Sequence, residues 1–571
     1  MKLAEATRIL NQNAALPGPA LEVFLACGFT PLHLKTFLVA QLAEISPARR
    51  ISVTTGTYGD LAGSLERAAR EGVRSVAAAL EWEDLDPRLG LRSAAPWRLA
   101  QLPDILATAT SRLGRLREAL AQLAERAPVA LSLPTLPLPP VFKVPLAQAD
   151  GFALRLQEHA FAFAASLADL PRVRVVSPQQ LDALSPLAAR ADVAAELRWG
   201  FPYSLEHASN LAGQLARLLA PPPACKGLIT DLDNTLWRGI LGDDGLEGIG
   251  WDLPHGSHGH ALYQRMLASL SDLGVLLGVA SKNNPALAEQ ALARPDLLVP
   301  RDRLFPVEAN WKPKSESVAR ILKAWNVGAE SVVFVDDSPL ELAEVQQAFP
   351  TMKTLLFPAQ SEAGIRALLD ELRDRFGRSS VETEDGLRVA SLRAAQERAV
   401  EAPGTSAETV LATAEATVTF AHDRPDPRAF ELVNKTNQFN LNGLRLDEAT
   451  WRTRTANPAR FLLTVSYADK FGPLGRIAVV GGTRAPAPRI DCWVMSCRAF
   501  SRRIEFHTLA ALFERLDADV LELDFIPTER NGPLREFLAA VLGADPIGPV
   551  RLTREALKTR CPPLYAKVTT E

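Results

Sequence analysis

The fold of this chain follows from one stretch, Gly227-Leu-Ile-Thr-Asp231-Leu-Asp233-Asn-Thr235-Leu-Trp237. The stretch begins as a short apolar run, which is typical of a buried strand, and the run ends in two aspartates two positions apart. In an open parallel sheet, ligands bind outside the carboxyl ends of the strands. We therefore expect Asp231 and Asp233 to carry chemistry at such an edge.

Two later apolar runs end in the same way. Residues 274–280 are followed by Ser281, and residues 332–335 are followed by Asp336 and Asp337. The intervening segments with a helix-like pattern are 261–273, 285–292 and 315–325. Alternation of strand and helix predicts a parallel α/β sheet, in which the polar ends of the three strands would meet at one edge.

The residue types at these strand ends suit magnesium and phosphate. If Asp231 and Asp233 face one cleft, they need a nearby cation or a shared proton, and an all-oxygen site with Asp336 and Asp337 suits Mg²⁺. Magnesium with a lysine and hydroxyl donors is what phosphoryl transfer needs, because the reacting group carries spread negative charge. The candidate groups are the hydroxyls of Thr235 and Ser281 and the amines of Lys312 and Lys314.

These motifs resemble those of the haloacid dehalogenase (HAD) superfamily, whose domain is a Rossmann-like parallel sheet. Together with the residues that surround them, the motifs are similar to those of subfamily IIIC, the FkbH-like proteins. The segments that carry this resemblance are Asp231-Leu-Asp-Asn-Thr-Leu-Trp237, Ser281-Lys-Asn-Asn284, Asn310-Trp-Lys-Pro-Lys314-Ser315 and Phe334-Val-Asp-Asp-Ser-Pro339. The resemblance implies a HAD domain at residues 221–378, which opens on consecutive prolines that favour a stiff linker.

The resemblance also implies a role for each motif residue. Asp231 would be the nucleophile that becomes an aspartyl phosphate, and Asp233 would be the general acid and base. Thr235, Ser281 and a lysine would bind the phosphate. Asp231, Asp336 and the backbone of Asp233 would hold Mg²⁺.

The identity of the phosphate lysine is open. In the superfamily the lysine often precedes a proline, which favours Lys312. The subfamily pattern Asn-Trp-x-x-Lys-Ser favours Lys314 instead. We choose Lys314.

Length and composition describe a globular chain with several domains. Its 571 residues are enough for roughly three or four cores, with 47% apolar and 23% charged residues. The net charge of −3 indicates neither a nucleic acid nor a membrane surface as a partner. No apolar run approaches the ~18 residues of a membrane span. The five cysteines lack disulfide or metal spacing, so we expect a cytoplasmic protein.

The first 220 residues alternate short apolar runs with helix-like stretches, which predicts another α/β domain. This part resembles the SGNH-hydrolase-like domain that precedes the HAD domain in FkbH-like proteins. Its first strand, however, runs into Ala26-Cys-Gly-Phe-Thr-Pro31, where an active hydrolase would carry Gly-Asp-Ser. We therefore expect a structural or binding domain without hydrolase activity.

The segment between the first strand of the HAD domain and its first helix is short for a capping domain. Residues 238–257 are rich in glycine, and we expect a helix only from about Gly259. An uncapped site would have room for a large partner.

Residues 379–571 read as a charged connector followed by an α+β domain with mixed strands and helices on one side. The domain resembles the GNAT-like acyltransferase domain of FkbH-like proteins, most specifically at Lys435-Thr-Asn-Gln-Phe-Asn440, which by itself reads as a solvated loop. GNAT enzymes cradle a pyrophosphate on Arg-x-x-Gly-x-Gly, but this chain has Arg498-Ala-Phe-Ser-Arg-Arg503. Candidate acyl-transfer residues are Cys497 and Arg498, and Arg502 and Arg503 could contact an acidic carrier protein.

The resemblance implies an FkbH-like enzyme of polyketide-type biosynthesis. Such an enzyme would dephosphorylate a phosphorylated three-carbon acid such as 1,3-bisphosphoglycerate and load the glyceryl group onto the phosphopantetheine arm of an acyl carrier protein. The sequence itself supports only the Mg²⁺-dependent phosphoryl step. Two alternatives stay open: a phosphatase that acts on a sugar or glycan precursor, and a scaffold with a vestigial HAD domain.

Overall fold

The computed structural model describes most of the chain in two compact units, Met1–Pro222 and Pro223–Glu571. The described residues are 1–94, 97–140, 143–170, 172–222, 224–378, 407–424, 426–436, 439–470, 472–484, 487–496, 499–500, 502–528 and 531–571.

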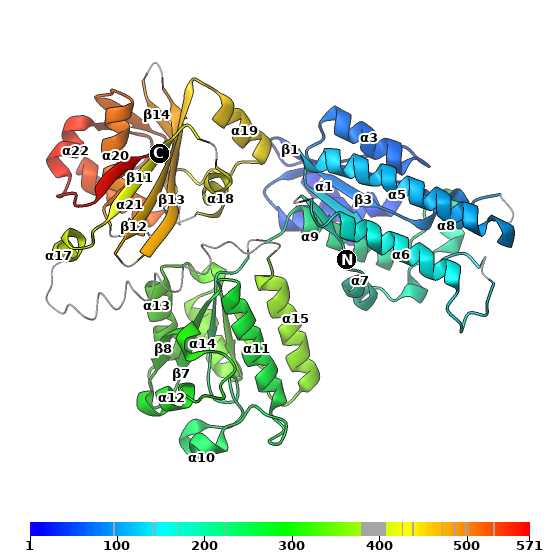
Figure 1. Ribbon diagram of the computed structural model, residues 1–571, viewed down its shortest axis with the longest axis horizontal. Helices are drawn as coiled ribbons and strands as arrows, with labels where there is room; N and C mark the ends of the chain where they lie inside the picture. Colours follow the sequence, from blue (N-terminus) through cyan, green and yellow to red (C-terminus); the bar gives the residue numbers. More distant parts are fainter. Residues whose placement is uncertain are drawn as a thin grey trace. The chain divides into compact units, whose positions relative to one another are not determined.

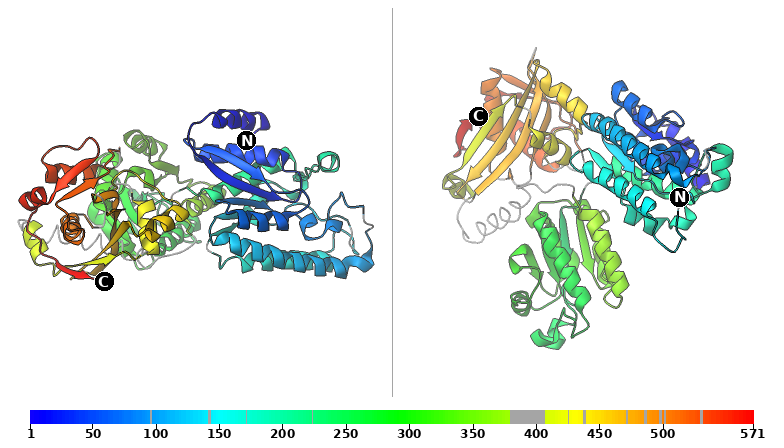
Figure 2. Two further views of the ribbon diagram at one scale, coloured as in Figure 1. Left: turned by 90° about the horizontal axis from the view of Figure 1, so that it is seen from above. Right: turned by 45° about the vertical axis from the view of Figure 1, so that its right-hand side comes forward.

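The first unit is built on a parallel sheet of five strands in the order β2-β1-β3-β4-β5. The strands are β1 (Ala20–Cys27), β2 (Arg50–Thr55), β3 (Val76–Ala79), β4 (Val129–Ser132) and β5 (Val173–Val175). Helices cover both faces (Figure 2, left), and two apolar cores fill the space between helices and sheet. The helices are α1 (Leu3–Ala14), α2 (Leu32–Ile45), α3 (Leu61–Glu71), α4 (Trp82–Leu85), α5 (Leu102–Ala124), α6 (Gly151–Ser166), α7 (Pro178–Leu184), α8 (Val193–Trp199) and α9 (Leu205–Leu219).

The second unit begins with another five-stranded parallel sheet, in the order β10-β9-β6-β7-β8. Its central strand β6 (Gly227–Thr230) is fully buried, and the chain first adds strands on one side of it and then crosses to the other. The remaining strands are β7 (Leu276–Ser281), β8 (Leu304–Ala309), β9 (Val332–Asp336) and β10 (Lys353–Leu356). The strand order therefore reverses at β6, which is where ligands bind in open parallel sheets.

Helices lie on both faces of this second sheet (Figure 1), and side chains alternate between two cores. They are α10 (Leu241–Gly248), α11 (His258–Asp272), α12 (Pro285–Leu292), α13 (Lys314–Trp325), α14 (Pro339–Ala348) and α15 (Glu362–Phe376). Gly227 and Gly278 let the Trp325 ring lie directly on the sheet, because a Cβ at either glycine would come within 2.6 and 2.8 Å of that ring. The Trp325 Nε1 donates to the Phe305 carbonyl at 2.7 Å.

Helix α10 corrects the expectation that residues 238–257 hold no helix. Its first turn is held by side chains that the local sequence does not reveal: Asp244 accepts from the Ile240 amide at 2.7 Å, and Asp233 accepts from the Leu241 amide at 3.1 Å. Gly245, at φ +69°, then kinks the helix. The glycines that suggested a loop therefore shape a short helix instead.

The rest of the second unit forms a seven-stranded mixed sheet in the order β16-β15-β14-β13-β12-β11-β17. Its strands are β11 (Thr417–His422), β12 (Arg460–Asp469), β13 (Gly472–Thr483), β14 (Arg489–Met495), β15 (Val520–Leu523), β16 (Val550–Thr553) and β17 (Lys567–Thr570). Its helices are α17 (Ala407–Ala412), α18 (Pro427–Lys435), α19 (Glu448–Ala456), α20 (Ile504–Arg515), α21 (Gly532–Leu542) and α22 (Arg554–Arg560).

One expectation for this sheet is wrong. Helices do not lie on one side only, because α18 and α19 form a core on the face opposite to α20 and α21. The run of residues 435–440, which by itself reads as a solvated loop, is buried at its end, since Phe439 and Asn440 are each 2% exposed, whereas Lys435 is exposed. The Asn440 side chain accepts from the Gly443 amide at 2.9 Å, and its carbonyl accepts from Asn531 at 3.0 Å.

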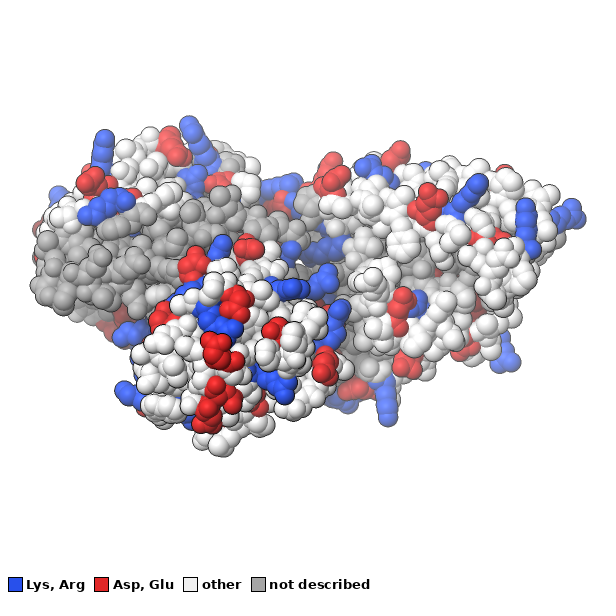
Figure 3. Space-filling model, turned by 60° about the horizontal axis from the view of Figure 1, so that its bottom comes forward, with Lys and Arg blue, Asp and Glu red and all other residues white. Residues whose placement is uncertain are grey.

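Charges of both signs are intermixed over the described surface shown in Figure 3, in keeping with a net charge of −3. Among the described residues, every helix is too short or too polar to cross a bilayer.

Candidate active site

Three carboxylates converge at the carboxyl edge of the second sheet. Asp231 directly follows β6, Asp336 ends β9, and the next residue is Asp337. Each offers an oxygen within 4.8 Å of the others, and Asp231 and Asp336 are buried. The Asp231 amide donates to the Val335 carbonyl at 3.0 Å, so the pairing of β6 with β9 fixes this arrangement.

Lys314, the first residue of α13, lies among these carboxylates with a side chain only 2% exposed. Its Nζ is 2.8 Å from Asp231 Oδ1 and 2.5 Å from Glu341 Oε2, and it also donates to Asp336. Burial alone would lower the pKa of this amine, but the facing carboxylates outweigh burial and raise the pKa. Lys312 is exposed, so Lys314 is the lysine that the fold brings to the aspartates.

Asp336 and Asp337 hold their protons more tightly than usual. Burial, followed by repulsion from Asp231, raises the pKa of Asp336. The same causes raise the pKa of Asp337 to about 6. A hard divalent cation bound by these clustered carboxylate oxygens would offset the repulsion between the carboxylates and so stabilise the cluster.

Asp233 is held apart from the three clustered carboxylates. Its Oδ1 accepts from Trp237 Nε1 at 3.0 Å and from the Leu241 amide at 3.1 Å, and its Oδ2 accepts from Asn283 at 2.9 Å. Burial raises the pKa of Asp233, the three hydrogen bonds lower it, and repulsion from Asp231 adds to the rise. The carboxyl group thus has a fixed orientation and an elevated pKa.

The two candidate hydroxyls are buried at the same sheet edge. Ser281 ends β7, and its carbonyl accepts from the Asn310 amide at 3.0 Å, which ties β7 to the segment before Lys314. Thr235 is fully buried, and its carbonyl accepts from His260 Nδ1 at 3.0 Å. Its own hydroxyl has no hydrogen-bond partner among the described residues. Phosphate binding by Thr235 and Ser281 stays a prediction.

The acyl-transfer candidates Cys497 and Arg498 lie outside the described residues. The neighbouring arginines are engaged within their own domain. Arg502 lies over the Tyr467 ring, 5.4 Å from its centroid, and Arg503 donates to the Pro563 carbonyl at 2.6 Å.

Sequence reasoning missed several residues that shape this site. Glu341, on α14, pairs with Lys314 and with Lys282, the latter at 2.9 Å. Burial raises the pKa of Glu341, but the two lysines outweigh it and lower the pKa. Trp237 and Asn283 stand inside the motifs, yet nothing in their spacing assigned them to Asp233. The one local signal for Glu341 was its own position, five residues after Asp336.

Comparison with solved structures gives a likeness over much of the chain. The N-terminal part of the protein BF1531 from Bacteroides fragilis, which contains a phosphatase domain and is complexed with Mg, matches with a TM-score of 0.52 and 19% identity, over 66% of this chain and 100% of that one. The two proteins share a fold. An uncharacterized protein from Corynebacterium glutamicum matches 27% of this chain and 98% of its own, at 18% identity and a TM-score of 0.19. No family model matches the sequence, and neither does any curated protein.

Proposed function

We propose that residues 221–378 form a HAD-type, Mg²⁺-dependent active site that removes the phosphate of a small phosphorylated substrate. The observation that carries this proposal is Lys314, buried against Asp231 and Asp336 at the edge where the strand order reverses. The shared fold with a phosphatase-containing protein complexed with Mg supports it.

The donor set fits magnesium. Asp231, Asp336 and Asp337 present oxygen ligands within 4.8 Å of one another, which is the hard donor chemistry that Mg²⁺ prefers. When bound, the ion would neutralise charge on the phosphoryl oxygens.

The protein's own residues account for the two proton transfers and the displacement. Asp231 attacks phosphorus, and the bond to the leaving oxygen breaks as Asp233 gives that oxygen its proton. Asp233 then takes a proton from the water that cleaves the aspartyl phosphate, which releases inorganic phosphate. Trp237 and Asn283 orient Asp233 for both steps, and Lys314 offsets the negative charge of the phosphoryl group.

The wider proposal follows the FkbH-like resemblance. An SGNH-like domain at residues 1–220 and a GNAT-like domain within 379–571 would flank the HAD site in a cytoplasmic enzyme that loads a three-carbon acyl group from a 1,3-bisphosphoglycerate-like donor onto an acyl carrier protein. The motif Lys435-Thr-Asn-Gln-Phe-Asn440 supports it.

Intact-mass spectrometry of a phosphopantetheinylated carrier protein tests both parts. The carrier is incubated with this protein, Mg²⁺ and 1,3-bisphosphoglycerate, and free phosphate is assayed in parallel. We expect a mass gain of one glyceryl group together with phosphate release. Asp231→Asn should abolish both without loss of fold, and unchanged turnover would refute its role as nucleophile. Phosphate release without the mass gain would instead favour a simple phosphatase.

A further inference from the structure

A cavity of about 650 Å³ lies in the first unit, at the carboxyl ends of three neighbouring parallel strands. Trp82 follows β3, Ser132 ends β4 and Val176 follows β5, and all three residues line it. This edge of a parallel sheet is where ligands bind, and the volume lies within the range of roughly 300–1,000 Å³ that small-molecule sites span.

The walls of the cavity are mainly apolar. They include Leu133, Leu136, Leu138, Ala153, Ala160 and Leu181. Because a water molecule takes about 30 Å³ in the liquid, a cavity of this size has room for roughly twenty waters, most of which would meet no polar partner on such walls. Replacing poorly bound water by an apolar group is favourable.

The charged side chains along the cavity are already matched. Of its described lining residues, Arg190 is the one cation; it donates to the carbonyls of Ser185 at 2.7 Å and Thr135 at 3.0 Å, and it pairs with Asp182. The carboxylate of Asp150 accepts from the amides at the start of α6. A bound carboxylate or phosphate would therefore find no unpaired positive charge among these residues.

One buried hydroxyl among the described lining residues has no partner. Ser132 is 1% exposed, and among the described residues nothing accepts from or donates to its hydroxyl. Thr135 is different, because its hydroxyl donates to Glu81 Oε1 at 2.5 Å and lies 2.9 Å from His207 Nε2. A buried hydroxyl without a hydrogen bond is unfavourable, so a ligand that both accepts and donates would satisfy Ser132.

We propose that this cavity binds an apolar chain of about ten carbons that ends in a neutral hydrogen-bonding group, with that group at Ser132. Such a ligand would fill about half of the cavity at roughly 30 Å³ per group. The site is separate from the carboxylates of the second unit, so its test does not depend on phosphate release.

Isothermal titration calorimetry of the full chain with 1-decanol, and with decanoate at pH 8, tests the class of ligand. We expect saturable binding of 1-decanol at one site and at least tenfold weaker binding of decanoate, because burying an unpaired carboxylate is costly. Absence of saturable 1-decanol binding would overturn the proposal. Equal or tighter binding of decanoate would overturn the neutral head group.

Two variants test the location. Ser132→Ala removes the proposed anchor but no hydrogen bond of the free protein, so we expect about fivefold to tenfold weaker 1-decanol binding with an unchanged or higher melting temperature. A lower melting temperature with unchanged affinity would show that the hydroxyl is purely structural. Ala153→Trp, at a half-buried position on α6, should block binding.

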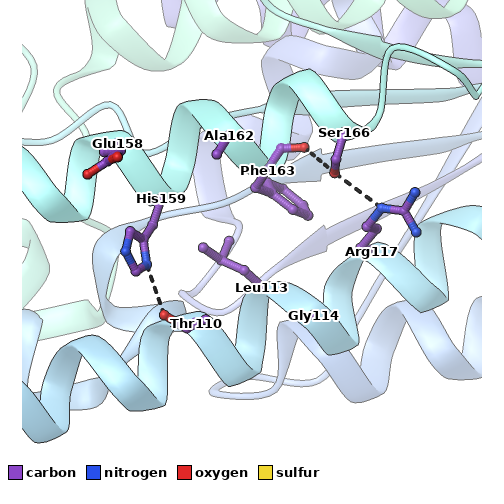
Figure 4. A pocket seen from close by; sticks show the side chains of 9 residues that line it. All are labelled: Thr110, Leu113, Gly114, Arg117, Glu158, His159, Ala162, Phe163 and Ser166. Carbon is purple, nitrogen blue, oxygen red and sulfur yellow. Dashed lines mark hydrogen bonds between the residues drawn. The ribbon is translucent and has the colours of Figure 1, made fainter.

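A second hollow on the same helix supplies the matched control. It lies between α5 and α6, has a volume of about 410 Å³ and is lined by Ala162 (Figure 4). Four of its polar side chains bond in pairs, Thr110 with His159 at 2.8 Å and Arg117 with Ser166 at 3.2 Å. Ala162→Trp should leave 1-decanol binding unchanged. If it weakens binding as much as Ala153→Trp does, the proposed cavity is not the site.

Discussion

The charge balance of the candidate active site depends on a single side chain. Lys314 is the cation that contacts both Asp231 and Asp336, and it also pairs with Glu341. An ammonium buried among carboxylates stabilises charge far more effectively than an exposed one, because no water screens it.

Lys314→Met should lower the rate of phosphate release by at least about a hundredfold, since removal of one preorganised charge from an active site typically has this effect. Lys312→Met is the matched control, because its exposed amine should change the rate less than about twofold. Steady-state kinetics on both variants, with circular dichroism to verify folding, provide the measurement. The reverse pattern would assign the role to Lys312.

Asn283→Ala should change the pH dependence of the reaction. The Asn283 amide donates to the Asp233 carboxylate and thereby favours its charged form, so loss of this bond should raise the pKa of Asp233 further. The protonated acid then persists to higher pH, and the alkaline limb of the kcat/KM profile should move upward while kcat at neutral pH falls about tenfold. A downward shift of that limb would contradict the proposed role of Asn283.

The aspartates could be predicted from sequence because each follows a strand, and strand ends meet at one edge. Lys314 was preferred to Lys312 only on the pattern of the subfamily that the motifs resemble. The partners of Asp233 could not. Trp237 and Asn283 reach it from different loops, and no spacing rule fixes which side chains such loops bring together.

At the scale of secondary-structure elements, the packing of α13 on its sheet depends on two positions without side chains. Gly227 and Gly278 lie under the Trp325 ring, and the indole nitrogen is anchored to Phe305. Close packing of this kind leaves little room for an added methyl group.

Gly278→Ala should therefore destabilise the second unit by about 1–3 kcal/mol, the usual penalty for overpacking a core. Gly242→Ala, on α10, is the matched control because nothing lies within 4 Å of the added Cβ. Urea denaturation of both variants provides the measurement. Equal stability of the two proteins would show that the ring relaxes without penalty.

Element boundaries show how far local signals reach. Helix α12 begins and ends as the apolar pattern predicts, at Pro285 and Leu292. Helix α10 escaped prediction because its start depends on Asp233, a non-local partner. The edge strand β17 was not predicted because its partner strand β11 is far away in the sequence. The hydroxyls of Thr419 and Thr569, which bond at 2.8 Å across this pair, are 150 positions apart.

At the scale of the whole molecule, a metal ion has one candidate site among the described residues. Its ligands would be Asp231, Asp336 and Asp337, which lie in the second unit. Binding to the native state stabilises only the unit that contains the site.

Mg²⁺ should therefore raise the melting temperature of one calorimetric transition and leave another unchanged, with a gain of about 2–3 kcal/mol at a hundredfold excess over Kd. Asp336→Asn should abolish this shift. Scanning calorimetry with Mg²⁺ and with a chelator provides the measurement, and a shift of every transition would contradict a single site.

The pairing of β11 with β17 has a consequence for synthesis on the ribosome. The first unit ends at Pro222, and its parallel sheet can close while later segments are still being translated. The seven-stranded sheet cannot, because the strand beside β11 comes from residues 567–570. Until those residues emerge, β11 presents an open edge, so the nascent chain should depend on chaperones longest over residues 417–422.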